Sequence, residues 1–299
     1  MLAGALAGCG DGQDPAPDAV AQPVAPKPLP SATRAASPAA KPAAAKKRAT
    51  ILSAADRASF GQLDASLGGE QGLAVSGLGK GRPVERVGSL RTGVAWSTSK
   101  VPIAMAVLDA GLGDSERDDL SAAITASDNA AARRLWTALG GGPAAAQAAD
   151  GQLAQAGDHR TRIEYRDLAG PSYTPFGQTN WALSDQARFS AGMACTGAGP
   201  QVLGLMGQVI ASQRWGLGAA GVAAELKGGW GPGTAPGATG GYLDRQMGVI
   251  TLHGKPLAVA IASRPADGSH GTGARDLTRI ARWLVAHADT RGVPARPRC

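Results

Sequence analysis

Three short polar motifs, in a fixed order, most constrain how this chain can fold. Residues 97–100 read Ser-Thr-Ser-Lys, of the form S-x-x-K, and residues 127–129 read Ser-Asp-Asn. Residues 227–229 read Lys-Gly-Gly, a one-residue variant of K-[TS]-G. Each motif alone is a weak signal. In this order they predict one serine-based active site, to which the middle and the end of the chain both contribute.

The first motif places a nucleophile and a base on one helix. A serine hydroxyl reacts poorly until a neighbour takes its proton. Ser97 and Lys100 lie one helical turn apart on the same face, and a desolvated lysine shifts towards the neutral form that accepts a proton. At a helix N-terminus, the backbone N–H of Ser97 is also placed to stabilise an oxyanion. An N-cap serine followed by a solvated lysine is the alternative interpretation.

The other two motifs supply groups that would contact a substrate. Ser127 could pass a proton to a leaving group and Asn129 could orient a substrate amide, although S-D-N also suits a helix cap. Lys227 provides positive charge for a carboxylate, and Gly229 keeps its strand clear for a ligand. The N–H of Trp230 is the natural second oxyanion donor.

Composition separates a tail from a folded part. Residues 10–49 hold eight prolines among Ala, Gln and Lys, which predicts an extended tether. From residue 50 to residue 299 the pattern predicts a single domain. The helices are expected near 53–67, 97–108, 120–124, 130–139, 143–157, 184–193, 200–212 and 275–287. The strands are expected near 73–78, 83–89, 226–230, 245–252 and 256–263, and a long loop near 158–182.

This order of elements predicts the fold class. Strands near both ends of the chain enclose a run of helices, which favours an α/β (α+β) fold with an antiparallel sheet closed by both chain ends. The helices between them would form an all-α insertion.

The N-terminus has features of a bacterial export signal. Residues 2–8 are apolar and small, and Leu6-Ala7-Gly8-Cys9 matches a lipobox, although the basic segment that normally precedes it is missing. Residues 1–9 therefore predict a lipoprotein signal in which Cys9 carries the lipid, and a chance Ala/Gly stretch is the alternative. The protein is expected to be exported and lipid-anchored at the outer face of the bacterial cytoplasmic membrane. Such a compartment would permit Cys195 and Cys299 to pair.

Charge and composition bear on possible partners. The net charge of +7 is not accompanied by a run of five basic residues or by interleaved aromatic residues, which argues against nucleic-acid binding. A basic surface favours contact with anionic lipid or acidic wall polymer. No pair of histidines has the spacing of metal ligands, so neither a metal nor another cofactor is predicted. We expect a monomer.

Residues 120–131, LSAAITASDNAA, resemble class A β-lactamases, which belong to the penicillin-recognising serine acyltransferases. The resemblance spans roughly residues 52–289. It implies an α/β sandwich with an all-α part and an active site between the two. It also implies acylation of Ser97 by a β-lactam or a related cell-wall peptide. It also gives the motif residues the roles described above. Arg245 resembles the arginine of that family that helps to hold the substrate carboxylate.

Two departures from the family lie around the motifs. Only thirty positions separate Ser97 from Ser127, fewer than is usual in the family, so the cleft should be more open. Gly228 replaces the hydroxyl residue of K-[TS]-G, which removes a hydrogen bond to a substrate carboxylate worth roughly 1.5–3 kcal/mol.

A third departure concerns deacylation. Class A enzymes use a glutamate in an omega loop to activate the deacylating water, with an asparagine four residues later. An ungapped comparison places Asp167 in the glutamate position, and Pro171 stands in place of the asparagine. Glu164 is the other candidate, and both acids could instead be ordinary loop residues.

These observations predict a cell-envelope serine hydrolase that acylates through Ser97, with Lys100 as base and slow or altered deacylation. One alternative is a D-alanyl-D-alanine peptidase acting on peptidoglycan, which shares the acylation step. The other is a non-catalytic module that holds a muropeptide or a protein in the open cleft. The intact polar residues of the motifs favour an enzyme, whereas the altered third motif and omega loop favour a binding module.

Overall fold

The computed structural model describes residues 50–170, 172–233 and 240–299. The predicted signal, the lipidation site at Cys9 and the predicted tether lie outside the described residues and stay predictions. Within the described part of the chain, no helix has both the length and the apolar character needed to cross a membrane.

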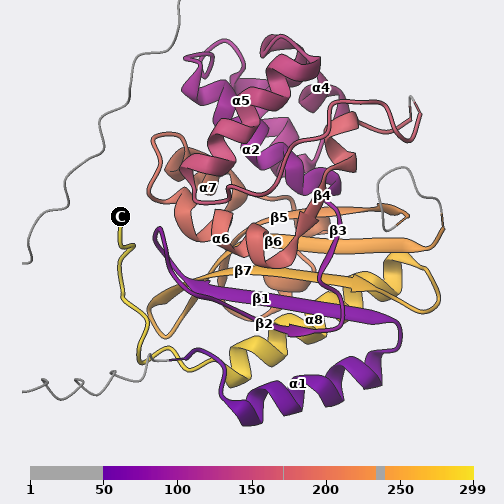
Figure 1. Ribbon diagram of the computed structural model, residues 1–299, viewed down its shortest axis with the longest axis vertical. Helices are drawn as coiled ribbons and strands as arrows, with labels where there is room; N and C mark the ends of the chain where they lie inside the picture. The colour runs from indigo at the N-terminus through magenta and orange to yellow at the C-terminus, as the bar shows by residue number, and fades with distance from the viewer. Residues whose placement is uncertain (1–49, 171, 234–239) are drawn as a thin grey trace, which may run out of the picture. The chain divides into compact units, whose positions relative to one another are not determined.

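A five-stranded antiparallel sheet forms the centre of the domain, in the order β2-β1-β7-β6-β5 (Figure 1). Because β1 pairs with β7, strands from the two ends of the domain complete one sheet. The predicted fold class is therefore confirmed. The strands are β1 (Glu70–Gly77), β2 (Val84–Gly88), β5 (Ala223–Pro232), β6 (Tyr242–Leu252) and β7 (Lys255–Arg264).

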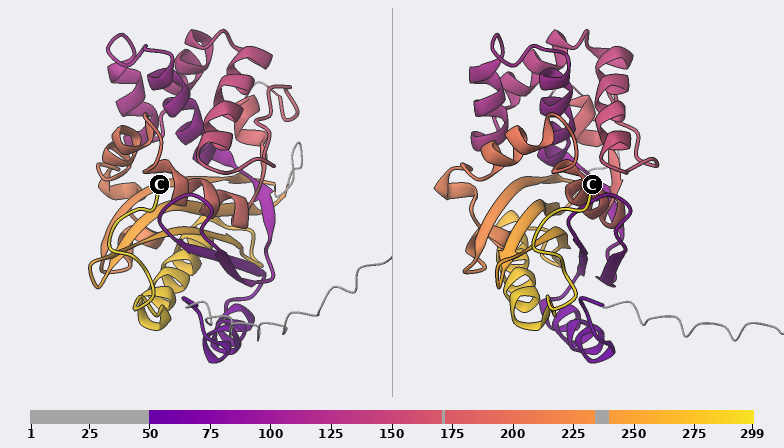
Figure 2. Two further views of the ribbon diagram at one scale, coloured as in Figure 1. Left: turned by 60° about the vertical axis from the view of Figure 1, so that its left-hand side comes forward. Right: turned by 90° about the vertical axis from the view of Figure 1, so that its left-hand side faces the viewer.

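Helices cover both faces of this sheet (Figures 1 and 2). On one face lie α1 (Ala54–Leu67) and α8 (His270–His287), which pack together through an edge-to-face contact of Phe60 with Trp283. A capping box between Ser53 and Asp56 starts α1. The other face is covered by α6 (Leu183–Met193) and by the all-α insertion.

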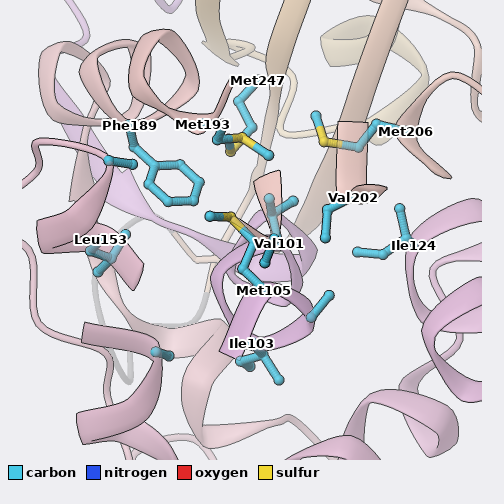
Figure 3. Packing of buried hydrophobic residues seen from close by; sticks show 14 of the residues in the cluster. Val101, Ile103, Met105, Ile124, Leu153, Phe189, Met193, Val202, Met206 and Met247 are labelled. Atoms are coloured by element: carbon cyan, nitrogen blue, oxygen red, sulfur yellow. The ribbon is translucent and has the colours of Figure 1, made fainter. Parts of the chain in front are cut away.

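The insertion is built around α2 (Lys100–Asp109), which is buried from Lys100 to Val107. Its sequence is apolar on all sides, as expected for a helix surrounded by other helices. Around it lie α3 (Arg117–Ser121), the π-helical turn η2 (Ala122–Ala126), α4 (Asn129–Ala138), α5 (Gly142–Gln155) and α7 (Gly199–Met206). Figure 3 shows Met247 of β6 beside Met193 and above Met105 of α2, so one apolar core joins the sheet to the insertion.

Several short elements differ from the sequence prediction. The helix expected at residue 97 begins as a 3-10 turn, η1 (Trp96–Ser99), and α7 ends at Met206 instead of residue 212. The expected loop at 158–182 contains η3 (Pro175–Gln178) and β4 (Asn180–Ala182), and β4 pairs with β3 (Thr92–Val94). Strands of three residues carry too little alternation to be recognised from sequence. The remaining 3-10 turns are η4 (Ala211–Gln213) and η5 (Gly216–Ala219).

A disulfide joins Cys195, just after α6, to Cys299. It links the insertion to the C-terminal segment, which runs beside Gly79. A disulfide is consistent with an exported protein, because such bonds persist mainly in oxidising compartments.

Removing this disulfide should lower the free energy of unfolding. The bond closes a loop of 104 residues, and the loss of such a cross-link typically costs about 2–5 kcal/mol. Urea denaturation of Cys195→Ser and of reduced wild type should show the same loss relative to oxidised wild type. Equal stability of all three forms would contradict this expectation.

Candidate active site

The three motifs meet where the insertion contacts the edge strand β5. The turn η1 carries Ser97, the segment between η2 and α4 carries Ser127, and β5 carries Lys227. The structure therefore brings together residues 97–100, 127–129 and 227–229 from distant parts of the sequence.

Ser97 is half-buried and lines a cavity of about 240 Å³ together with Asn129 and Trp230. The preceding residue, Trp96, has a backbone φ of +48°, which is rare for a bulky side chain. Such backbone conformations persist only where the surrounding structure enforces them, and they cluster at functional sites.

Lys100, at the start of α2, is buried and uses its whole donor capacity on the S-D-N motif. Its Nζ donates to the carbonyl oxygens of Ser127 (2.6 Å) and Asp128 (3.2 Å) and to Asn129 Oδ1 (2.7 Å). Burial lowers the pKa of Lys100 to about 7, although the charge of Asp128 opposes this shift. A large fraction of Lys100 is therefore neutral at neutral pH and able to accept a proton.

Lys227, which lies on the sheet strand β5, also contacts Ser127. Its Nζ donates to Ser127 Oγ at 2.7 Å and to the carbonyl oxygen of Gly228 at 2.9 Å. Burial lowers the pKa of Lys227 well below its usual range, and the nearby charge of Lys100 lowers it further. Ser127 thus contacts two buried lysines of perturbed pKa, Lys227 through its hydroxyl and Lys100 through its carbonyl oxygen, and perturbed pKa values of this kind cluster at catalytic sites.

Local backbone geometry holds Ser127 in this position. Ser127 ends the π-helical turn η2 with a left-handed φ of +62°. The next residue, Asp128, caps α4 by accepting from Ala131 N at 2.7 Å. Both interpretations of S-D-N are therefore compatible, because the helix cap also orients a polar side chain at the site.

Gly229 allows β5 to approach η1 closely. A Cβ added at this position would lie 2.8 Å from Ala95 O, 2.9 Å from Ser97 N and 3.0 Å from Thr98 N. These are backbone atoms that cannot move aside without shifting η1. The glycine thus has a packing role, in contrast to the expectation that it keeps the strand clear for a ligand.

The substitution Gly229→Ala should push β5 away from Ser97. We expect a loss of stability of about 1–3 kcal/mol from overpacking. Acylation of Ser97 should slow about a hundredfold, because small displacements of reacting groups are costly. Gly151→Ala is the matched control, since an added Cβ meets no atom within 4 Å there. Similar behaviour of the two variants would contradict the proposed role of Gly229.

The structure does not bring Arg245 to the site. Its guanidinium is buried beneath β3 and β4, where it donates to Gly93 O, Val94 O, Trp181 O and Gln186 Oε1. Burial lowers its pKa to about 9, so it stays charged at neutral pH. The interpretation of Arg245 as a carboxylate-binding residue is therefore corrected, because both terminal nitrogens of its guanidinium, Nη1 and Nη2, are bonded inside the fold.

The two acids of the predicted omega loop form their contacts within that loop. Asp167 is exposed, and its carboxylate accepts from Gly170 N at 2.8 Å. Hydrogen bonds from Arg166 lower the pKa of Glu164 to about 2, and the two side chains form an ion pair at 2.7 Å. Asp167 is thus exposed and bonded within its own loop, and the carboxylate of Glu164 is bound by Arg166.

Sequence reasoning missed the aromatic residues of the cavity. Trp96 and Tyr173 form one aromatic pair and Tyr242 lies at the start of β6, beside the expected Trp230. The chain has only twelve aromatic residues (6 Trp, 3 Tyr, 3 Phe), so four of them at one cavity is a notable concentration. The adjacency of Trp96 to the S-x-x-K motif was the available signal.

Comparisons with solved structures identify the architecture. A β-lactamase from Chitinophaga pinensis matches with a TM-score of 0.61 and 17% sequence identity, over 78% of this chain and 98% of that one. The fold is that of the class A β-lactamases. A class A β-lactamase from Mycobacterium abscessus matches with a TM-score of 0.57 and 16% identity, over 77% and 98% of the two chains.

A variant of the class A β-lactamase of the last common ancestor of Gram-negative bacteria is also similar. Its TM-score is 0.55 at 21% identity, over 78% of this chain and 98% of that one. No family model and no curated protein matches the sequence. At these identities the class A β-lactamase likeness shows the fold, and the activity has to be argued from the site.

Proposed function

We propose that this protein is a serine hydrolase that forms an acyl-enzyme at Ser97 with β-lactams or related cell-wall peptides. The observation that carries the proposal is the pair of buried lysines that both bond Ser127, Lys100 at its carbonyl oxygen and Lys227 at its hydroxyl. Burying two ammonium groups side by side is energetically unfavourable. A lysine of lowered pKa is useful as a general base.

In the proposed acylation step, Lys100 removes the proton from Ser97 Oγ as this oxygen attacks the substrate carbonyl carbon. As an ammonium, Lys100 has three N–H groups, and three oxygens accept them. The neutral amine has two N–H groups and one lone pair, so deprotonation releases one contact and creates the proton acceptor.

The second half of the step cleaves the substrate amide. The carbon–nitrogen bond breaks and the nitrogen takes a proton from Ser127 Oγ, which contacts Lys227. Lys227 returns a proton to Ser127 Oγ. The proton that Lys100 takes from Ser97 thus balances the proton that ends on the leaving group. The backbone N–H of Ser97 and that of Trp230 on the edge strand β5 are the proposed oxyanion donors.

Deacylation is proposed to be slow. An efficient second step needs a base that positions a water molecule beside the ester. In the described part of the omega loop, Asp167 is exposed and bonded within its own loop, while the carboxylate of Glu164 is held by Arg166. The proposal therefore favours a long-lived acyl-enzyme.

Intact-mass spectrometry of the full chain, followed over time with a penicillin and with a cephalosporin, tests this function. We expect an adduct on wild type that decays slowly and is absent from Ser97→Ala. The control Ser115→Ala, at an exposed serine on the insertion, should behave like wild type. Fast decay would contradict slow deacylation and identify an efficient β-lactamase.

The two alternatives give other outcomes. A D-alanyl-D-alanine peptidase would keep the adduct indefinitely and would cleave a D-alanyl-D-alanine peptide. A binding module would show no adduct from any acyl donor, although the variant and wild type are both folded by circular dichroism. That last result would overturn the proposed function.

A further inference from the structure

The cavity beside Ser97 has an aromatic and uncharged lining. Trp96, Tyr173, Trp230 and Tyr242 are the aromatic residues that line it, and Ser97 and Asn129 are among its polar lining residues. None of the described residues that line it carries a charge. Pockets of this kind bind ring systems through apolar contact and use a few polar groups for orientation.

Trp230 and Tyr242, which we call the aromatic wall of the cavity, pack against further aromatic rings. Trp230 stacks on His270 with ring centroids 5.3 Å apart and an interplanar angle of 20°, and Trp215 meets Trp230 edge-on at 5.8 Å. Tyr242 lies 5.9 Å from the same imidazole. Because several rings hold Trp230 in place, it offers a preformed surface to a ligand.

The positive charges that could hold a carboxylate are withdrawn from this cavity. Arg245 is engaged by four oxygens beneath β3 and β4. The residue opposite Gly228 on β6 is Gln246, whose side chain is bonded to Leu217 N and to Trp215 O. The side chain opposite Gly228 is therefore neutral and already bonded. Lys227, whose Nζ donates to Gly228 O at 2.9 Å, has a pKa that burial holds well below its usual range.

The space next to Gly228 is already occupied. A Cβ added at Gly228 would lie 3.3 Å from two ring atoms of Trp215 and 3.5 Å from the ring of Trp230. A threonine or serine hydroxyl at this position would therefore compete with the two tryptophan rings. The absence of a hydroxyl residue at position 228 and the presence of the tryptophan rings beside it therefore belong to one packing arrangement.

A buried carboxylate lies behind the same wall. Asp244 has an exposed fraction of 0% and contacts His270 Nδ1 at 2.5 Å, while its Oδ2 has no partner among the described residues. Burial raises its pKa to about 6, so at neutral pH it is mostly ionised. An anionic substrate group placed against Trp230 would be repelled by this charge.

We propose that this cavity selects an uncharged, ring-bearing acyl donor, meaning an ester or amide without a carboxylate next to the scissile bond. The proposal rests on the proposed function, because it assumes that Ser97 is acylated, and it narrows the substrate class. Trp230 and Tyr242 act as specificity residues that contact the ring. Esters and internal amides of cell-wall material then fit the site better than a free β-lactam acid.

A matched pair of acyl donors tests the charge selection directly. Benzylpenicillin and its methyl ester share every ring and differ only in the carboxylate. Intact-mass spectrometry of the full chain gives the second-order rate constant of acylation for each. We expect the ester to react at least about tenfold faster, a discrimination of ordinary size for one substrate group.

The outcomes separate this inference from the proposed function. A faster reaction of the free acid, with the adduct absent from Ser97→Ala, would overturn the selection and leave the proposed acylation standing. The absence of any adduct from both compounds would overturn the proposed function and this inference with it.

Variants of the aromatic wall test the specificity residues. Tyr242→Ala should lower the acylation rate for the methyl ester about tenfold. The matched control Tyr165→Ala, at an exposed loop tyrosine, should leave the rate unchanged. Thermal melts check that both variants fold. A double variant, Gly228→Ser with Trp215→Ala, should shift the acylation preference from the methyl ester back towards the free acid. Equal effects of the two tyrosine substitutions would contradict the proposal.

Discussion

The substitution Lys100→Met should slow acylation of Ser97 by at least about a hundredfold, because general-base groups contribute typically 10²–10⁴-fold. Methionine keeps the apolar stem of the buried side chain, while the proton acceptor is lost. The three oxygens that Lys100 contacts lose their donor, but Asn129 is exposed and can bond to water. The rate is measured by intact-mass spectrometry with an excess of acyl donor.

A lysine elsewhere provides the comparison. Lys80 is exposed in the turn between β1 and β2, so Lys80→Met should acylate at the wild-type rate. A wild-type rate for Lys100→Met as well would show that another group takes the proton from Ser97. Melting temperatures of the two variants confirm that a slow rate does not reflect unfolding.

The substitution Arg245→Met should strongly destabilise the fold. The substitution removes the donor of four oxygens beneath β3 and β4, which belong to Gly93, Val94, Trp181 and Gln186. Each buried acceptor left without a partner costs about 1–3 kcal/mol, so the total loss should be at least about 3 kcal/mol. Urea denaturation measures it.

The matched control is an exposed arginine of the same sheet. Arg86 on β2 is exposed, and Arg86→Met should change the free energy of unfolding by less than about 0.5 kcal/mol. If Arg245→Met were as stable as Arg86→Met, the buried guanidinium would not be a structural residue. It would then again be a candidate for substrate binding.

The architecture could be predicted because its signals are local and strong. The apolar runs of β1, β6 and β7 and the helical periodicity of α8 predicted the sheet and its position on both sides of an insertion. The three motifs predicted which segments meet. The two cysteines were left open in the sequence, and only the fold shows that they pair.

The face of each strand residue could not be predicted, since a shift of one residue reverses it. Arg245 is opposite Gly229 and Gln246 is opposite Gly228, so the expected cation points beneath β3 and β4. Those two strands have three residues each and left no pattern in the sequence. The aromatic wall depends on the same register, because it determines that Trp230 and Asp244 share a face.

The lowered pKa values of Lys100 and Lys227 also could not be predicted from the sequence. A motif can place Lys100 near Ser97, but the burial that shifts its pKa comes from tertiary packing around α2, to which α4, α5 and α7 contribute. For the acids of the loop, the position in the sequence suggested a role, but their contacts depend on the folded loop. Asp167 has a plausible position in the sequence, yet its loop leaves it exposed and bonded to Gly170.

The pH dependence of Ser97 acylation tests the central claim most directly. Because burial lowers the pKa of Lys100 to about 7, the neutral base is lost as the pH falls below this value. The acylation rate constant should be nearly constant above pH 8 and fall about tenfold per pH unit below pH 6.5. A rate that stays constant from pH 5 to pH 9, or that rises as the pH falls, would contradict the account.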